Sequence, residues 1–265
     1  MNPMLNIATR AARQAGRVLM RYYERTEQLT IHDKGRHDFV TEVDRAAELT
    51  IVKELRSKFP QHAILAEESG RQGDSEFVWI IDPLDGTTNY LHGFPQFAVS
   101  IGLECRGKLE LGVVYDPLSE ELFTAARGQG AHLNDRRIRV AKRPSLDGAL
   151  IGTGFPFREH RHTDRYLGML KTVMQEAAGI RRAGSAALDL AYVAAGRLDG
   201  FWEIGLAPWD LAAGAVLITE AGGLVSDLTG GRDYLDSGNL VAANPRLHQV
   251  LVDRLRPSLE GKPAG

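Results

Sequence analysis

The sequence predicts a mixed α+β and α/β fold, in which an antiparallel-sheet half precedes an α/β half. Between Phe77 and Ala141, short apolar runs alternate with glycine and proline turns, and such short turns favour antiparallel pairing. After about residue 145, apolar strands alternate with helical segments, which is typical of an α/β arrangement. We therefore expect two closely joined halves, residues 1–145 and residues 146–265, with a shared cleft that suits a small molecule.

Several helices and strands can be placed before the region of short strands. A first helix is predicted from its start, where Asn2 is the cap and Pro3 the first helical residue, and from the helical spacing of the apolar residues that follow. A second helix is expected to start near Thr41, with Asp44 giving a capping-box-like start, and to stop before Pro60. A short strand is then predicted over Ala63 to Ala66.

The remaining elements follow from apolar runs and helical spacing. Antiparallel strands are predicted at FVWII, FAVSIGL, LELGVVY, ELFTAA and IRVA. In the α/β half, strands are expected at ALIGTGF, GIRRAG, DGFWEIG, GGLVSDL and NLVAAN, with helices over about 164–178, 186–196, 210–221 and 246–256. The tail PSLEGKPAG is expected to fray.

Composition excludes several classes of protein. The chain has 265 residues, of which 43% are hydrophobic and 25% charged, as in an ordinary globular protein. No apolar run approaches the roughly 20 residues that span a bilayer, and the N-terminus lacks a signal-peptide core, so a cytoplasmic protein without a membrane partner is expected. The net charge of −2 gives no overall attraction to nucleic acid. The single cysteine, Cys105, allows no disulfide within one chain.

The segment FVWIIDPLDGTTN, residues 77–89, places two aspartates close together. Pro83 lacks an N–H and favours an extended Asp82 before it, so we expect a sharp turn that lets Asp82, Asp85 and the Leu84 carbonyl face one point. Oxygen ligands of this kind suit Mg²⁺. The following Gly86-Thr87-Thr88 begins a short helix or turn whose N–H groups can seat a phosphate. Taken alone, however, DPLDG also fits a surface turn.

Two further carboxylates strengthen the hypothesis of a metal site. Glu67 ends the predicted strand in ILAEES, and Asp210 opens the predicted helix in PWDLAAG. Singly, Glu67 fits a solvated strand end and Asp210 fits a helix cap. Together with Asp82 and Asp85, they suit a two-metal phosphoryl-transfer site.

These residues carry a family resemblance that covers nearly the whole chain. WIIDPLDGTTNYLHGFP and PWDLAAGAVLITEAGG resemble the two signature motifs of the inositol monophosphatase family of Mg²⁺-dependent, lithium-sensitive phosphatases. LAEES, FVTEVD and RRAGSAALDLAYVAAGRLDGFWE provide matching context. Within the family, the chain looks closest to the bacterial SuhB-type branch. The resemblance implies a layered αβαβα sugar-phosphatase fold, a homodimer, and two or three Mg²⁺ ions in each active site.

The resemblance also implies a role for individual residues. Glu67, Asp82 and the Leu84 carbonyl would hold the first Mg²⁺, and Asp82, Asp85 and Asp210 the second. Glu67, Thr87 and Asp44 would be catalytic, because Thr87 paired with Asp44 would orient and help deprotonate the attacking water. Lys34 matches a family lysine near the metals, although an exposed loop lysine is as good an interpretation. The substrate would contact Asp85, Gly86, Thr87, Thr88, Arg181, Gly184, Ser185, Ala186, Glu203 and Asp210.

The implied reaction is hydrolysis of inositol 1-phosphate to inositol and phosphate by a metal-activated water. Other sugar or nucleotide phosphomonoesters are alternatives, since specificity depends on loops. A second hypothesis is an accessory role in the antitermination complex on RNA polymerase that serves ribosomal RNA synthesis, with which the SuhB-type branch is associated. Two basic groups could contact RNA or an RNA-bound assembly, although a solvated, charge-balanced face explains them as well. They are Arg10, Arg13, Arg17, Arg21 and Arg136, Arg137, Arg139, Lys142, Arg143.

His160 and His162 resemble part of a metal cluster. Their two-residue spacing in a polar loop, without a partner motif, favours a surface loop instead. GTGF, from Gly152 to Phe155, is too short for a dinucleotide fingerprint, and no GxSxG is present. We therefore expect neither a dinucleotide cofactor nor a serine nucleophile.

Overall fold

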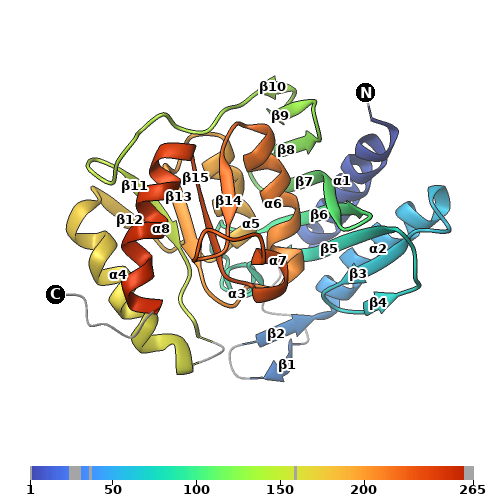
Figure 1. The fold of residues 1–265 in the computed structure, drawn as a ribbon. Coiled ribbons are helices and arrows are strands. Elements are labelled where there is room, and N and C mark those ends of the chain that lie inside the picture. Colours follow the sequence, from blue (N-terminus) through green and yellow to red (C-terminus); the bar gives the residue numbers. More distant parts are fainter. Residues whose placement is uncertain (1, 24–30, 36–37, 158–159, 260–265) are drawn as a thin grey trace.

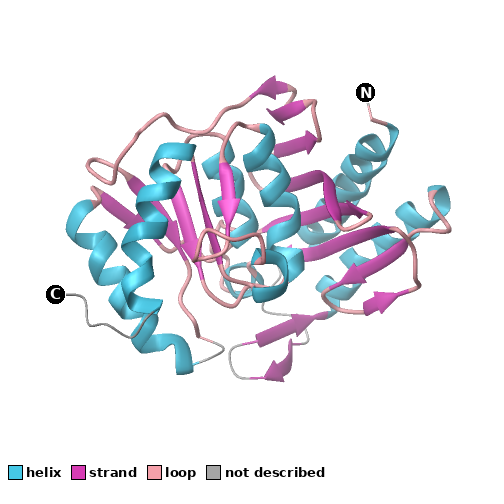
Figure 2. Ribbon diagram, in the orientation of Figure 1, coloured by secondary structure: helices cyan, strands magenta, loops and turns pink. Residues whose placement is uncertain are grey.

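A computed structural model describes residues 2–23, 31–35, 38–157 and 160–259 (Figure 1). The described strands form two large sheets and one hairpin. The eight-stranded sheet has the order β10-β9-β8-β7-β6-β5-β3-β4, and the five-stranded sheet has the order β12-β11-β13-β15-β14. Figure 2 shows helices outside both sheets and between them, so that the layers alternate as αβαβα. The layered fold implied by the sequence is confirmed.

The first large sheet is antiparallel except where β3 runs parallel to β5. Its strands are β3 (Ala63–Ala66), β4 (Gly70–Gln72), β5 (Phe77–Asp85), β6 (Ala98–Cys105), β7 (Lys108–Asp116), β8 (Glu121–Ala126), β9 (Gly130–Leu133) and β10 (Arg136–Arg137). The hairpin contains β1 (Ile31–Gly35) and β2 (Asp38–Thr41). The second sheet is mixed and contains β11 (Leu150–Thr153), β12 (Gly179–Arg181), β13 (Gly200–Glu203), β14 (Leu224–Ser226) and β15 (Leu240–Ala243).

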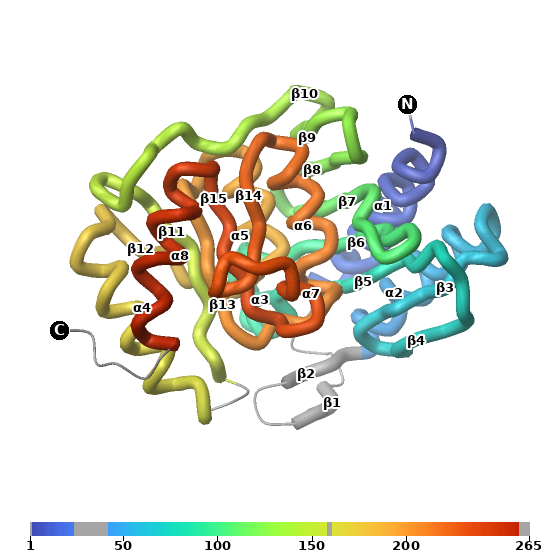
Figure 3. The backbone as a smooth tube through the Cα atoms, in the orientation of Figure 1, coloured from blue at the N-terminus to red at the C-terminus, as the bar shows by residue number. Residues whose placement is uncertain are grey.

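The helices cover the sheets in three layers, which Figure 3 lets the reader follow along the chain. On the eight-stranded sheet lie α1 (Pro3–Tyr23) and α2 (Glu42–Lys58); between the sheets lie α5 (Ala186–Ala194) and α6 (Pro208–Glu220); beyond the five-stranded sheet lie α4 (Thr163–Glu176) and α8 (Pro245–Leu259). Shorter helical turns are α3 (Thr87–Leu91), η2 (His160–His162) and α7 (Tyr234–Ser237). None of the described helices is long and apolar enough to cross a membrane.

Side-chain alternation along β6 explains the layering. Val99, Ile101 and Leu103 point into a core shared with α1 and α2, whereas Ala98 belongs to the central core with α5 and α6. Because successive strand residues face opposite sides, an apolar run of this length is buried on both faces. A third core joins the five-stranded sheet to α4 and α8.

Close approach of α6 to the sheet depends on a small residue in β7. A Cβ atom at Gly112 would overlap the backbone of Ala213, including its carbonyl oxygen. The glycine therefore lets α6 lie directly on the strands. This contact matters for function because α6 carries Asp210 in its first turn.

Two expectations about elements need correction. IRVA is not a strand: Val140 donates its N–H to the Ala221 carbonyl (3.2 Å) at the end of α6, and β9 and β10 form the sheet edge instead. The start of the tail does not fray, because α8 continues through Leu259; the residues after it lie outside the described range. The segment from 138 to 149, without helix or strand, joins the two sheets, and the division into two halves near residue 145 stays a prediction.

Candidate active site

Asp82 and Asp85 lie on one strand, where a bulge brings them to the same side. The sequence predicted a sharp turn after Asp82, but the strand β5 continues to Asp85 instead. Asp82 pairs with Ser100 and Asp85 with Ala98, so β5 advances three residues while β6 advances two. On a regular strand, residues three apart point to opposite faces of the sheet. The extra residue in the β5 bulge instead brings Asp82 and Asp85 to the same face. Asp82 Oδ1 also accepts the Leu84 N–H (2.9 Å).

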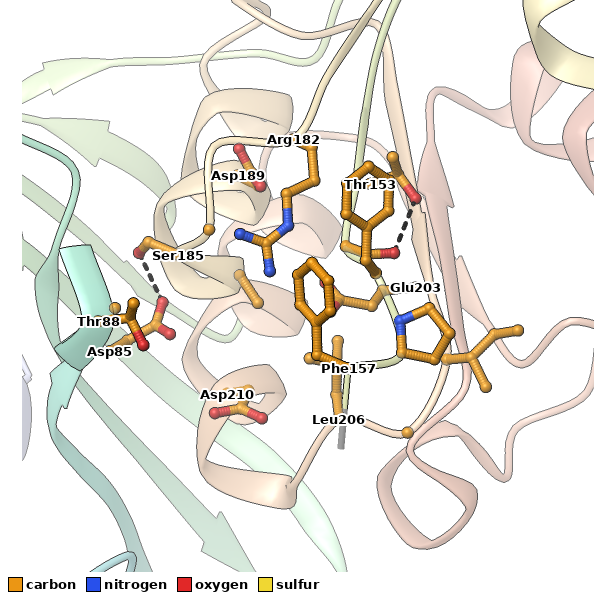
Figure 4. A pocket seen from close by; sticks show the side chains of 18 of the residues that line it. Asp85, Thr88, Thr153, Phe157, Arg182, Ser185, Asp189, Glu203, Leu206 and Asp210 are labelled. Atoms are coloured by element: carbon orange, nitrogen blue, oxygen red, sulfur yellow. Dashed lines mark hydrogen bonds between the residues drawn. The ribbon is translucent and has the colours of Figure 1, made fainter. Parts of the chain in front are cut away.

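Asp210, which lies on α6, completes the acidic cluster. One ligand oxygen each from Asp82, Asp85 and Asp210 lies within 4.8 Å of the others. Asp210 is in the first turn of α6, where its Oδ2 accepts the Ala207 N–H (2.7 Å). Asp85 Oδ2 accepts the Ser185 hydroxyl (2.6 Å) and the Ala187 N–H (2.7 Å). Figure 4 shows Asp85 beside Ser185, with Asp210 at the start of α6.

The electrostatics of the cluster fit a divalent cation. Asp82 is 1% exposed, and its burial, followed by the charges of Glu67, Asp85 and Asp210, raises the pKa of its carboxyl well above the ordinary value. A buried carboxylate beside like charges is unfavourable unless a cation compensates it. All the atoms of the cluster that could bind a metal ion are oxygens, which suits a hard ion such as Mg²⁺. The residues that would hold it are Glu67, Asp82, Asp85, Asp210 and the Leu84 carbonyl, all of which line the cavity.

The predicted phosphate seat adjoins the cluster. Gly86 has φ 91° and precedes α3, and a Cβ atom there would come within 2.8 Å of the Gln96 carbonyl oxygen, so only glycine fits without strain. Thr87 and Thr88 follow in the first turn of α3, where N–H groups have no helical acceptor. All three residues line the same cavity as the acidic cluster.

Thr87 connects this seat to the buried Asp44. Its hydroxyl lies 3.2 Å from Asp44 Oδ1 and 3.0 Å from the Leu84 carbonyl oxygen. Asp44 is 1% exposed in the first turn of α2, 43 residues earlier in the chain. The structure therefore contains the Thr87–Asp44 pair that the resemblance implied, and the role of the pair toward water stays a prediction.

The cavity has a volume of about 810 Å³ and extends from the acidic cluster toward the five-stranded sheet. Gly184, Ser185, Ala186 and Glu203 all line the cavity, and their contacts with a substrate stay a prediction. Burial, and then the charges of Asp210 and Asp189, raise the pKa of Glu203 well above its usual range. Carboxyl groups and backbone polar groups at this end suit the hydroxyls of a polyol.

Of the two neighbouring arginines, the resemblance implied a substrate contact for Arg181, but Arg182 is the one that lines the cavity. Arg181 is exposed and is not among the lining residues. The difference follows from extended backbone, in which neighbouring side chains point to opposite sides. In Figure 4 the Arg182 guanidinium points into the pocket, and it lies 5.4 Å and 5.0 Å from the ring centres of Phe155 and Phe157.

Asp189 is a second residue that sequence reasoning missed. It lines the cavity from α5 and is 2% exposed, and burial, followed by the Asp85 charge, raises the pKa of its carboxyl. The spacing of four residues from Ser185 places both on one face of α5, which is the signal that could have found it.

Of His160, His162 and Lys34, the described part of the structure includes the side chain of His162 alone. His162, expected in a surface loop, also lines the cavity, beside Arg161. The side chain of His160 lies outside the described part of the structure. Lys34 lies on β1, and its side chain is likewise outside that part.

The alternating layers and the cavity with its acidic cluster are those of the layered sugar-phosphatase class of metal-dependent phosphatases. Residues 1–260 match the inositol monophosphatase family, and the chain belongs to that family. A Pseudomonas aeruginosa protein named Nus factor SuhB is 55% identical over 265 residues, covering 98% of each chain.

Solved structures agree with this assignment. The extragenic suppressor protein SuhB of Bartonella henselae superposes with a TM-score of 0.93 and 48% identity, covering 96% of this chain and 99% of that one. Inositol monophosphatase from Anabaena superposes with a TM-score of 0.84 and 42% identity over 97% of each chain.

Proposed function

We propose that the protein is a Mg²⁺-dependent phosphomonoesterase that hydrolyses inositol 1-phosphate to inositol and phosphate. The observation that carries the proposal is the convergence of Asp82, Asp85 and Asp210 within 4.8 Å in a cavity that also contains the start of α3. Membership of the inositol monophosphatase family supports the same reaction class.

Each group in the cavity then has a chemical task. Two or three Mg²⁺ ions, held by the acidic cluster, would supply charge neutralisation and a lowered pKa for water. The N–H groups of Gly86 and Thr87 bind phosphate oxygens, which positions phosphorus for in-line attack. Thr87 orients the attacking water and relays its proton to the Asp44 carboxylate as the new P–O bond forms. The ester P–O bond breaks, and the departing alkoxide takes a proton from solvent water to give the alcohol. Gly184, Ala186 and Glu203 bind the alcohol.

The test is phosphate release by Asp85→Asn with inositol 1-phosphate and saturating Mg²⁺. Replacing the carboxylate by an amide removes a metal ligand, and a loss of about 100-fold or more is expected. Asp74→Asn is the control, because Asp74 is fully exposed and outside the cavity. Near-normal turnover by a folded Asp85→Asn variant would contradict the metal assignment.

The identity of the alcohol needs a separate measurement. Phosphate release across a panel of sugar, polyol and nucleotide phosphomonoesters, with and without Mg²⁺ and Li⁺, ranks the substrates. Inositol 1-phosphate should give the highest kcat/KM, and Li⁺ should inhibit. A sugar bisphosphate or a nucleotide at the top of the ranking would replace inositol phosphate as the substrate.

A second function is favoured by one specific observation: the relative that is 55% identical over the whole chain is named a Nus factor. We propose that this protein also joins RNA polymerase and Nus factors in an antitermination complex, independently of catalysis. The exposed Arg136 and Arg137 on β10 offer a cationic surface for RNA, whereas Arg10 is paired with Glu54. The tagged wild type and Asp85→Asn should retain RNA polymerase equally; failure of both would contradict this role.

We also propose a homodimer, the state expected from the family. Light scattering after size exclusion should give twice the 29.1 kDa chain mass. A mass of one chain across the working concentration range would contradict it.

A further inference from the structure

Ser185 lies at the junction between the acidic cluster and α5. It is the N-cap of α5, with extended backbone at φ −138°, and it is 1% exposed. Its hydroxyl donates to Asp85 Oδ2 (2.6 Å) and accepts the Leu188 N–H (3.4 Å). Figure 4 shows Ser185 beside Asp85 with the hydrogen bond between them, although the two residues are 100 positions apart in the chain.

A serine hydroxyl has a single proton, and here that proton is committed to Asp85. The hydroxyl therefore cannot donate to a substrate hydroxyl at the same time, although the sequence indicated a substrate contact. We infer that Ser185 is a positioning residue for the metal site, which holds the Asp85 carboxylate in the orientation that a divalent ion requires.

The distribution of hydrogen bonds on Asp85 supports this inference. Oδ2 accepts two of them, from Ser185 and from the Ala187 N–H at 2.7 Å. Two donors from the start of α5 therefore hold Oδ2 and fix the plane of the Asp85 carboxylate. The N-terminus of α5 also favours the ionised carboxylate, because its N–H groups carry partial positive charge.

The restraint acts against a specific force. Asp82 and Asp210 repel the Asp85 carboxylate, and without a restraint this repulsion would rotate it away from the cluster. The hydrogen bonds from α5 keep the three carboxylates together before an ion binds. Asp210 is restrained in a similar way by the Ala207 N–H, but that donor is backbone and no substitution removes it cleanly. Ser185 is thus the restraint that can be tested.

The inference rests on the proposed metal-dependent function, and direct metal binding tests it. Calorimetric titration of the metal-stripped, full-length protein with Mg²⁺ or Mn²⁺ should give a dissociation constant about 10- to 100-fold weaker for Ser185→Ala than for wild type. KM for substrate at saturating metal should stay unchanged. Ser185→Thr, which keeps the hydroxyl, should restore the affinity.

Two further variants separate this effect from loss of folding. Ser226→Ala removes another buried hydroxyl, bonded to His248 and outside the cavity, and should leave metal affinity unchanged. Ser185→Gly keeps a residue that caps helices nearly as well as serine, so it serves if Ser185→Ala does not fold.

The results distinguish the inference from the function on which it rests. Wild-type metal affinity in Ser185→Ala or Ser185→Gly, combined with a raised KM, would overturn the positioning role and return Ser185 to the substrate site. If the wild-type protein binds no divalent ion, the proposed function itself fails.

Discussion

Arg181 and Arg182 are neighbours in the chain and both are exposed, but only Arg182 lines the cavity. The positive charge of Arg182 opposes the raised pKa values of Asp189 and Glu203. Removing it would favour their protonated forms and remove hydrogen-bond donors from the alcohol end. We expect Arg182→Ala to raise KM for inositol 1-phosphate about tenfold, the equivalent of one lost charged hydrogen bond.

Arg181→Ala is the matched control for this prediction. Arg181 is exposed and lies outside the cavity, so steady-state kinetics of this variant should equal those of wild type. The assignment of Arg182 would be wrong if the two variants had the same KM.

At the residue scale, the sequence predicted the acidic cluster because its members sit in long motifs at element ends. Asp82, Asp85 and Asp210 do converge. It could not distinguish the two arginines of RRAG, because the choice depends on where β12 ends. Nor could it find that Ser185 donates its proton to Asp85, since that contact joins residues 100 positions apart.

At the scale of elements, the contact between β7 and α6 predicts a coupled loss of stability and metal affinity. Gly112→Ala would force a Cβ atom against the Ala213 backbone, and overpacking of this kind costs about 1–3 kcal/mol. Because Asp210 is in the first turn of α6, displacement of the helix also moves a metal ligand. Thermal unfolding should show a lower Tm, and the Mg²⁺ concentration for half-maximal activity should rise.

Gly179→Ala provides a strand-glycine control. A Cβ atom at Gly179 would meet only side-chain atoms, at 3.4 Å, which is ordinary contact. Unchanged Tm in Gly112→Ala would show that α6 can move away from β7 freely, contrary to the prediction.

The contact between β14 and α8 should make stability depend on pH. His248 Nε2 lies 2.8 Å from the Ser226 hydroxyl, and burial lowers the pKa of this histidine below its ordinary 6.5. The unfolded chain therefore binds the proton more readily than the folded one. The stabilisation is complete above the unfolded pKa and is lost as pH falls through the folded pKa, with a slope of at most about 1.4 kcal/mol per pH unit.

Urea unfolding between about pH 7.5 and pH 5 measures this dependence. His248→Gln should flatten the profile relative to wild type, whereas His92→Gln, at an exposed site, should not. Parallel profiles for wild type and His248→Gln would show that another group controls the slope.

Elements with long apolar runs or clear caps could be predicted from the sequence. α1 begins at Pro3, with Asn2 Oδ1 accepting the Met4 N–H (3.0 Å), and β3 spans Ala63–Ala66 as expected. IRVA has the composition of a strand, yet the chain there crosses to the second sheet and Val140 bonds to Ala221. Local preference could not reveal a tertiary partner 81 residues away.

At the scale of the whole molecule, the acidic cluster joins the eight-stranded sheet to the central helix layer. Asp82 and Asp85 come from the eight-stranded sheet, while Asp210 belongs to α6 in the layer between the sheets. The mutual repulsion of these carboxylates therefore acts between β5 and α6 as well as within the site. A divalent ion that replaces this repulsion by attraction should stabilise the entire fold.

We expect Mg²⁺ to raise the Tm of the metal-stripped protein, because an ion that binds only the folded state adds free energy as its concentration rises. At 100 times the dissociation constant the gain is about 2.7 kcal/mol, which for a chain of this size shifts Tm by several degrees. NaCl at equal ionic strength should give little shift, since screening is weak inside a buried cluster. Asp85→Asn should lose most of the Mg²⁺ response while keeping the fold, because the variant lacks one ligand and has less repulsion to relieve. Equal shifts with Na⁺ and Mg²⁺ in wild type would show that the carboxylates are merely screened, without a specific metal site.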